Sequence, residues 1–304
     1  MTSGKLLEIN GILQKMRINP IANNGYSEYF ECKSGDNLFY RVWKAENQTR
    51  IVIGIHGMAA HSEYYIQVAD QLIDKGISVF ALDLKHHGHS TGKIGDLKNF
   101  QELIDQVHEF ILKIKNENSG IPIFLMGISM GGCLAINYSI KYPEDINGLI
   151  LMAPAVKVNL KFSFYDILKL PILGIVYLVN KSKPIISIEK RSLDLGTRNP
   201  LRKEYDKNDE YRIKKVSVRY LLQINSWVKK AFKNRNKISH PVIIFQGSDD
   251  KLVSPESVEQ FYKDLNINDK SLIILKGAYH TLFSDPAMEN ENGWKKMSEW
   301  ILAH

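Results

Sequence analysis

The sequence predicts an α/β fold, in which a mostly parallel, twisted sheet is flanked by helices and carries a helical insertion. Two observations support this prediction. From residue 51 to residue 152, short apolar runs alternate with helical patterns, as they do where parallel strands are joined by helical crossovers. Between residues 155 and 239 only helical patterns are convincing, and the alternation resumes at residue 241.

Each element follows from its local pattern. Residues 1–26 form a variable lead-in, and two apolar segments around a polar turn at residues 34–37 predict a β-hairpin. Short apolar runs suit strands buried on both faces, and they occur at residues 51–55, 77–82, 121–126, 148–152, 241–245 and 271–275. Helices are expected at residues 64–75, 99–116, 130–142, 255–265 and 289–303. We therefore expect one α/β core, residues 27–154 and 240–304, with a helical cap at residues 155–239.

Length and composition are those of a globular protein. The 304 residues, 44% of them hydrophobic, can form one large α/β domain with an insertion. The two cysteines, Cys32 and Cys133, lie in apolar segments and suit neither a disulfide framework nor a zinc site. The first ten residues lack the apolar core of a secretion signal, and no apolar run reaches the ~18 residues of a membrane span. We expect a cytoplasmic protein.

The formal net charge of +7 is concentrated in the insertion. Between Lys181 and Lys237 there are 17 Lys and Arg residues against 6 Asp and Glu. Such an excess of positive charge can bind nucleic acid or an anionic lipid surface, or it can simply form a solvated helical face. The aromatic residues of this segment come at irregular intervals, unlike those of single-strand binding surfaces. We expect no nucleic-acid partner.

A candidate nucleophile lies between a predicted strand and a predicted helix. The string Gly127-Ile128-Ser129-Met130-Gly131 follows the apolar run at residues 121–126 and opens a helical segment. A serine flanked by glycines in that context is typical of a nucleophile elbow. The turn is so tight that side chains at the glycine positions would collide with backbone. The alternative is a glycine-rich turn without chemistry.

Candidate partners for Ser129 follow two later strands. Asp249 and Asp250 come after the strand at residues 241–245, and His280 comes after the one at residues 271–275. These loops leave the carboxyl ends of their strands, the edge where Ser129 is also expected. A serine hydroxyl needs an imidazole to take its proton, and that imidazole needs a carboxylate to fix its tautomer. His240 precedes the acids and begins a strand, so we interpret it as structural.

Two backbone amides are candidates for an oxyanion hole. His56-Gly57-Met58 closes the strand at residues 51–55, where the chain must turn beneath the serine. The amide of Met58 can then point into the site beside that of Met130. One such donor contributes about 3–4 kcal/mol to the stabilisation of a tetrahedral oxyanion. The side chains of both methionines can equally serve as apolar gap-fillers, which does not affect the role of their amides.

The sequence resembles the monoacylglycerol lipase and lysophospholipase branch of the α/β-hydrolases, also grouped with serine-aminopeptidase-like hydrolases, from about Tyr29 to its end. The motifs are His56-Gly57-Met58-Ala59-Ala60-His61-Ser62, Asp83-Leu84-Lys85-His86-His87-Gly88-His89-Ser90, the elbow, Gly247-Ser248-Asp249-Asp250, Gly277-Ala278-Tyr279-His280 and, in the cap, Thr197-Arg198-Asn199-Pro200. The resemblance implies an α/β-hydrolase fold without a cofactor. It also implies Ser129 as nucleophile, Asp250 rather than Asp249 as acid, His280 as base, and the amides of Met58 and Met130 as oxyanion hole.

The chain departs from this pattern at His86, where relatives usually carry glycine. Because Asp83, His87 and His89 are close in sequence, a metal site is an alternative to a polar loop beside the active site. Spacing alone fixes no coordination geometry, and we assign no metal.

The insertion suggests an amphiphilic substrate. Residues 162–179 are its most apolar stretch, and they can line an acyl-chain pocket, contact a membrane interface, or simply pack on the core. An apolar lid followed by a cationic segment predicts a monoacylglycerol or lysophospholipid esterase, with peripheral contact to an anionic membrane as an option. The alternatives are a short-chain carboxylesterase, an aminopeptidase or amidase on the same scaffold, and a non-catalytic module that binds lipids or small molecules.

Overall fold

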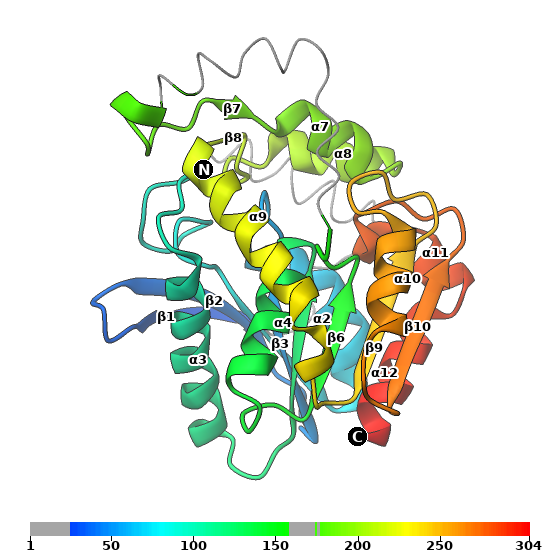
Figure 1. Cartoon of the computed structure of the whole chain (residues 1–304). Coiled ribbons are helices and arrows are strands. Elements are labelled where there is room, and N and C mark those ends of the chain that lie inside the picture. The colour runs from blue at the N-terminus through cyan, green and yellow to red at the C-terminus, as the bar shows by residue number, and fades with distance from the viewer. Residues whose placement is uncertain (1–24, 158–173, 175–176) are drawn as a thin grey trace.

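The computed structural model describes residues 25–157, 174 and 177–304. The expected lead-in lies almost entirely outside the described residues, as does most of the apolar stretch at residues 162–179. The fold is the predicted one, a mostly parallel sheet covered by helices on both faces (Figure 1).

Eight strands form the central sheet in the order β1-β2-β4-β3-β5-β6-β9-β10. The first two make the predicted hairpin, antiparallel to each other and to β4, and all other neighbours are parallel. The strands are β1 (Tyr26–Glu31), β2 (Asn37–Trp43), β3 (Arg50–Ile55), β4 (Ile77–Leu82), β5 (Ile123–Ile128), β6 (Gly148–Met152), β9 (Val242–Gly247) and β10 (Lys270–Leu275). Strand β5 therefore lies between β3 and β6, near the middle of the sheet.

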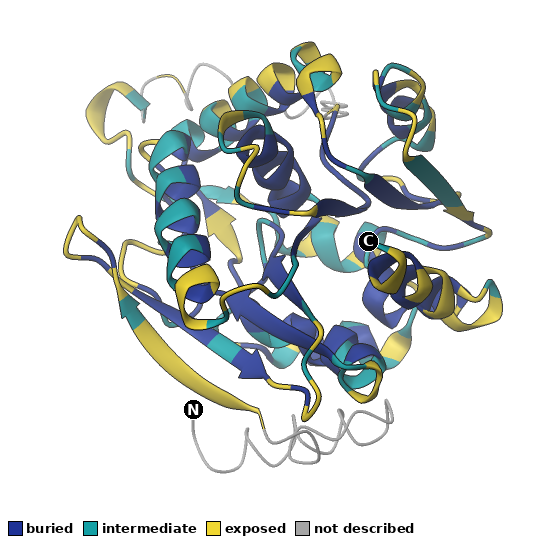
Figure 2. Ribbon diagram, turned by 90° about the horizontal axis from the view of Figure 1, so that it is seen from below, coloured by how far each residue is buried: buried dark blue, intermediate teal, exposed yellow. Residues whose placement is uncertain are grey.

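Helices cover the two faces of the sheet and bury a separate apolar cluster on each. One cluster includes residues of α3 (Phe100–Glu117), α4 (Met130–Lys141), α9 (Val218–Lys233) and α10 (Pro255–Lys263). The other includes residues of α2 (Ile66–Leu72), α11 (Ala287–Asn290) and α12 (Gly293–Ala303). Figure 2 shows the inner strands buried and the edge strand β1 exposed. Parallel strands buried on both faces explain the continuous apolar runs of the sequence.

Three predicted elements differ in detail. The helix expected at residues 64–75 consists of two 3₁₀ segments, Ser62–Tyr65 and Ile73–Lys75, around α2. The final helix is split into α11 and α12 because Asn292 adopts a left-handed conformation, with φ 54°. The insertion, expected to be largely helical and without strands, also contains the short antiparallel pair β7 (Ile186–Ser187) and β8 (Lys215–Val216).

The other regular elements of the described insertion are helical. They include α7 (Glu189–Gly196), α8 (Pro200–Asn208), α9 and a 3₁₀ turn at Arg235–Lys237. Pro200 begins α8, and the Asn199 side chain accepts from the amides of Leu201 and Arg202. Figure 1 shows α7 and α8 above the carboxyl edge of the sheet, whereas α9 descends across α4. The domain boundaries at residues 155 and 239 remain our proposal.

Buried charges join the insertion to the loop after β3. Nε2 of His61 lies 2.9 Å from Oδ2 of Asp209, and both side chains are almost wholly buried. Tyr64 donates to Asp206 (2.9 Å) and accepts from Arg212 (2.7 Å). Removing one partner of such a buried network is strongly destabilising. The network therefore holds residues 206–212 of the insertion against residues 61–64.

Candidate active site

Ser129 occupies a strained turn between β5 and α4. Its φ of 55° and ψ of −117° are unusual for a residue with a side chain. A Cβ on Gly127 would lie 2.3 Å from the carbonyl oxygen of Gly131, and one on Gly131 would lie 2.1 Å from that of Ile55. The glycines are therefore required by close backbone approach, as the sequence predicts.

Sheet register brings the loop after β3 beside this turn. Ile55, the last residue of β3, pairs with Gly127 of β5. A Cβ built on Gly57 would lie 3.5 Å from Cβ of Ser129. The peptide that carries the Met58 amide is thus next to the serine, and the Met130 amide lies at the amino terminus of α4.

His56 fixes the orientation of the Gly57–Met58 peptide. The amide of Leu84 donates to Nε2 of His56 (3.0 Å), so the imidazole proton is on Nδ1, which donates to the Gly57 carbonyl (2.8 Å). Because N–H and C=O of a trans peptide point in opposite directions, the Met58 amide points away from His56. Burial lowers the pKa of His56 to about 4, so the ring is neutral. No role for His56 was predicted from the sequence, although the signal was its place between a strand and a glycine.

Asp250 and His280 form a buried pair. Nδ1 of His280 lies 2.7 Å from Oδ2 of Asp250. The other carboxylate oxygen accepts from the amides of Leu252 (2.8 Å) and Val253 (2.9 Å). Burial alone would raise the pKa of Asp250, but the neighbouring His280 and these amides outweigh it and lower the pKa. The carboxylate is thus ionised, the Nδ1 proton faces it, and Nε2 remains as the basic nitrogen.

Asp249 has a different environment from Asp250. It is exposed, and it accepts from the hydroxyl of Ser248 (2.8 Å). His240 bonds the Pro143 carbonyl through Nε2 (2.7 Å), away from this pair. Among the described residues, neither the Ser129 hydroxyl nor Nε2 of His280 has a hydrogen-bond partner, so these two groups are free to engage a substrate.

A turn of the insertion holds the His280 loop. The amide of Thr281 donates to the Gly196 carbonyl (2.7 Å), and Nδ2 of Asn199 donates to the Ser284 carbonyl (3.0 Å). Arg198 lies 3.7 Å from the Asp285 carboxylate. The Thr197-Arg198-Asn199-Pro200 motif, noted in the sequence only through resemblance, thus packs against the segment that carries His280.

The histidines of the loop after β4 point to different partners. Nδ1 of His87 faces the Lys85 carbonyl (3.0 Å), and the His89 ring packs between Phe39 and Tyr211, at 4.7 and 4.1 Å between centroids. Asp83 accepts from the amides of Ser62 and His89, at 2.6 and 2.9 Å. Within the residues that the structure describes, no group of three or more His, Cys, Asp or Glu side chains is arranged to hold a metal ion.

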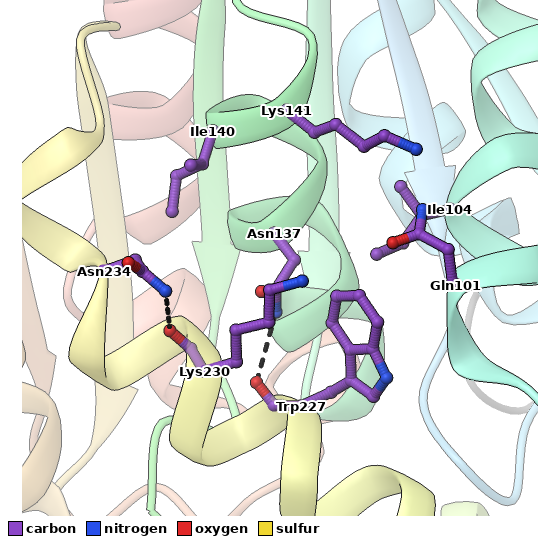
Figure 3. A pocket seen from close by; sticks show the side chains of 8 residues that line it. All are labelled: Gln101, Ile104, Asn137, Ile140, Lys141, Trp227, Lys230 and Asn234. Carbon is purple, nitrogen blue, oxygen red and sulfur yellow. Dashed lines mark hydrogen bonds between the residues drawn. The ribbon is translucent and has the colours of Figure 1, made fainter.

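A cavity of about 320 Å³ lies elsewhere, between α3, α4 and α9 (Figure 3). Its lining residues are Gln101, Ile104, Asn137, Ile140, Lys141, Trp227, Lys230 and Asn234. Asn137 donates to the carbonyl of Trp227 (3.3 Å), and the Lys230 ammonium lies 3.8 Å from the indole centroid. None of the candidate catalytic residues lines this cavity.

Comparisons with known proteins identify the family and the fold. The family model described as serine aminopeptidase, S33, matches residues 46–287. Phospholipase YtpA of Bacillus subtilis is 29% identical over 82% of this chain and 94% of its own length. The monoglyceride lipase of Homo sapiens is 26% identical over 88% of this chain and 87% of its own length. The crystal structure of the Paleococcus ferrophilus monoacylglycerol lipase is 25% identical and superposes with a TM-score of 0.76, covering 88% of this chain and 99% of that one.

Proposed function

Because the chain belongs to the serine aminopeptidase S33 family, we propose that it is a serine hydrolase that cleaves the carboxylic ester of an acyl-chain lipid, a monoacylglycerol or a lysophospholipid. The observation that carries the proposal is the buried Asp250–His280 pair at the sheet edge where the Ser129 turn emerges. No cofactor has a part in the reaction.

In the proposed first step, Nε2 of His280 takes the proton of Ser129 while Oγ bonds to the ester carbonyl carbon. The electron pair of the broken π bond moves to the carbonyl oxygen, which the amides of Met58 and Met130 stabilise. The C–O bond to the alcohol then breaks, and His280 donates its proton to the leaving oxygen. Asp250 holds the ring in the required tautomer and stabilises the imidazolium.

The second half of the cycle repeats these roles with water. His280 removes a proton from water, whose oxygen bonds to the acyl carbon. When the tetrahedral intermediate collapses, the bond to Ser129 breaks and the serine recovers its proton from His280. Free carboxylic acid and unchanged enzyme are the products.

The names of relatives support the lipid substrate. The similar proteins named above are a phospholipase, a monoglyceride lipase and a monoacylglycerol lipase. Each match covers at least 87% of the relative's own length. The family description, serine aminopeptidase, keeps an amide substrate as the second candidate.

A screen over esters and amides tests the substrate class. We expect kcat/KM for 1-monoacylglycerols and lysophosphatidylcholines to exceed that for p-nitrophenyl acetate by at least tenfold, because a longer acyl chain contributes about 0.8 kcal/mol per buried CH₂. A higher kcat/KM for p-nitrophenyl acetate would favour the short-chain esterase. A higher kcat/KM for amino-terminal peptide amides would favour the aminopeptidase.

We also propose that the protein is cytoplasmic and that its cap binds peripherally to anionic membranes. The side chains of Leu178 and Val179 are 78% and 82% exposed, and Lys181 and Lys183 follow them. No helix of the described residues has the length and apolarity needed to cross a bilayer. Exposed apolar side chains beside lysines suit interfacial binding.

Vesicle co-sedimentation tests the membrane contact. We expect binding to phosphatidylglycerol vesicles that weakens with salt, and little binding to phosphatidylcholine. Replacing Leu178 and Val179 by serine should reduce binding at least threefold. Leu302→Ser, which changes an exposed leucine of α12, is the control, and equal effects of the two changes would contradict the proposal.

A further inference from the structure

Tyr220, in the first turn of α9, is buried against Met130, one residue of the proposed oxyanion hole, and against His87, which contacts the other, Met58. Its hydroxyl lies 2.9 Å from Nε2 of His87 and 3.3 Å from Sδ of Met130. The same Nε2 lies 3.2 Å from the carbonyl oxygen of Met58. Tyr220 and His87 are both fully buried. One hydroxyl from the insertion thus contacts Met130 directly and the Met58 segment through His87.

The protons of this cluster can be assigned. Burial, followed by the nearby His56, lowers the pKa of His87 to about 3, so its ring is neutral and carries one proton. Nδ1 faces the Lys85 carbonyl at 3.0 Å and Nε2 faces the Met58 carbonyl at 3.2 Å. Both carbonyls can only accept, and we place the proton on Nδ1 because its contact is the shorter one. Burial raises the pKa of Tyr220, which keeps its hydroxyl proton. With the ring proton on Nδ1, the hydroxyl donates to Nε2 of His87 at 2.9 Å, because an imidazole nitrogen is a stronger acceptor than the thioether Sδ of Met130 at 3.3 Å.

This assignment leaves two acceptors facing each other, Nε2 of His87 and the carbonyl oxygen of Met58. The proton that Tyr220 donates is what offsets their repulsion. Without it, either the ring shifts its proton to Nε2 and loses its bond to Lys85, or Nε2 and the Met58 carbonyl move apart. Both outcomes disturb the loop that holds the Met58 amide.

The position of Tyr220 does not depend on its hydroxyl. The Ser217 amide donates to the Gly95 carbonyl (2.7 Å), and the Ser217 hydroxyl donates to Asp96 (2.6 Å). Arg219 donates to the same carboxylate through Nε (2.6 Å). These bonds anchor the first turn of α9 to the loop after β4, so removal of one oxygen should leave the helix in place.

We propose that Tyr220 and His87 are positioning residues that set the geometry of the oxyanion hole and couple the insertion to catalysis. The proposal rests on the proposed function, because it takes the Met58 and Met130 amides as the oxyanion donors. Neither side chain needs to touch the substrate. Their effect should appear in the transition state, where the oxyanion forms, more than in substrate binding.

Tyr220→Phe tests this role. Loss of one oxyanion donor costs about 10²–10³ in kcat, and displacement of one donor should cost less. We expect kcat for p-nitrophenyl butyrate to fall about 10- to 100-fold, with KM changed less than threefold. Inhibition by a trifluoromethyl ketone, whose adduct carries an oxyanion, should weaken in parallel.

Tyr205→Phe is the matched control. Tyr205 is also a buried tyrosine of the insertion, and its hydroxyl donates to Glu63 across the same interface (3.0 Å). The control should lose a similar amount of thermal stability and keep kcat within about threefold. Equal kcat for the two variants would overturn the positioning role.

A double-mutant cycle adds a second test. His87→Asn keeps an amide near the Lys85 carbonyl but removes the Nε2 acceptor. If the two residues act as a unit, adding Tyr220→Phe to the His87→Asn variant should lower kcat by less than about twofold. A double variant whose loss in kcat equals the product of the two single losses would overturn the proposal. Full activity of Ser129→Ala would instead overturn the proposed function, and this inference with it.

Discussion

Replacing Ser129 by alanine should abolish turnover, with kcat for p-nitrophenyl butyrate reduced on the order of 10⁶-fold. Loss of the nucleophile of a Ser-His-Asp enzyme has an effect of that size, because the covalent acyl-enzyme route is no longer available. Any residual rate would come from water held near the amides of Met58 and Met130. Initial rates at high enzyme concentration, corrected for the uncatalysed reaction, measure this change.

The fold should survive the substitution. In the native turn the Ser129 hydroxyl has no hydrogen-bond partner among the described residues, and the strain lies in the backbone, which alanine shares. We expect the melting temperature to stay within about 2 °C, and labelling by a fluorophosphonate probe to disappear. Unchanged turnover would remove Ser129 from the mechanism. A wild-type protein that resists the probe and hydrolyses no ester would favour a non-catalytic binding module.

The fold was predictable because its signals are local and repeated. Runs such as residues 51–55 and 77–82 are apolar throughout because strands β3 and β4 are covered on both faces. Boundaries were less accurate, as at β5, which begins at Ile123 rather than residue 121 and extends to Ile128. The break at Asn292 has no strong sequence signal, because asparagine adopts the left-handed conformation only where the surrounding packing requires it.

The candidate site was predictable where chemistry demands a residue type. Ser129 directly follows β5, Asp250 and His280 lie in the loops after β9 and β10, and the structure pairs the last two. The groups that we propose to position the Met58 and Met130 amides were not predictable. His56 and His87 act through backbone carbonyls, and Tyr220 comes from a helix about 90 residues beyond the serine. Spacing in the sequence cannot show which carbonyl a buried imidazole will face.

Asp250→Asn should lower kcat by about 10⁴-fold, as loss of the acid does in this type of triad. The Asn side chain can turn its NH₂ toward Nδ1 of His280, which places the ring proton on Nε2. That nitrogen could then no longer accept the proton of Ser129. The imidazolium formed in the transition state would also lose its neighbouring charge.

Stability should change little in the Asp250→Asn variant. Asparagine keeps an oxygen for the amides of Leu252 and Val253. The cost of burying a charge disappears, which offsets part of the favourable interaction with His280 that holds the pKa of Asp250 low. A variant that folds normally, labels slowly with a fluorophosphonate and turns over about 10⁴-fold more slowly would identify Asp250 as the acid. KM should change less than kcat.

Asp249→Asn is the internal control, because it makes the same chemical change one residue earlier. The Asp249 side chain is exposed and accepts from Ser248, so its charge is screened by solvent and does not reach His280 through a hydrogen bond. We expect kcat within about twofold of the wild type. The opposite ranking of the two variants would assign the acid to Asp249, and it would require the β9 loop to rearrange before Ser129 can react.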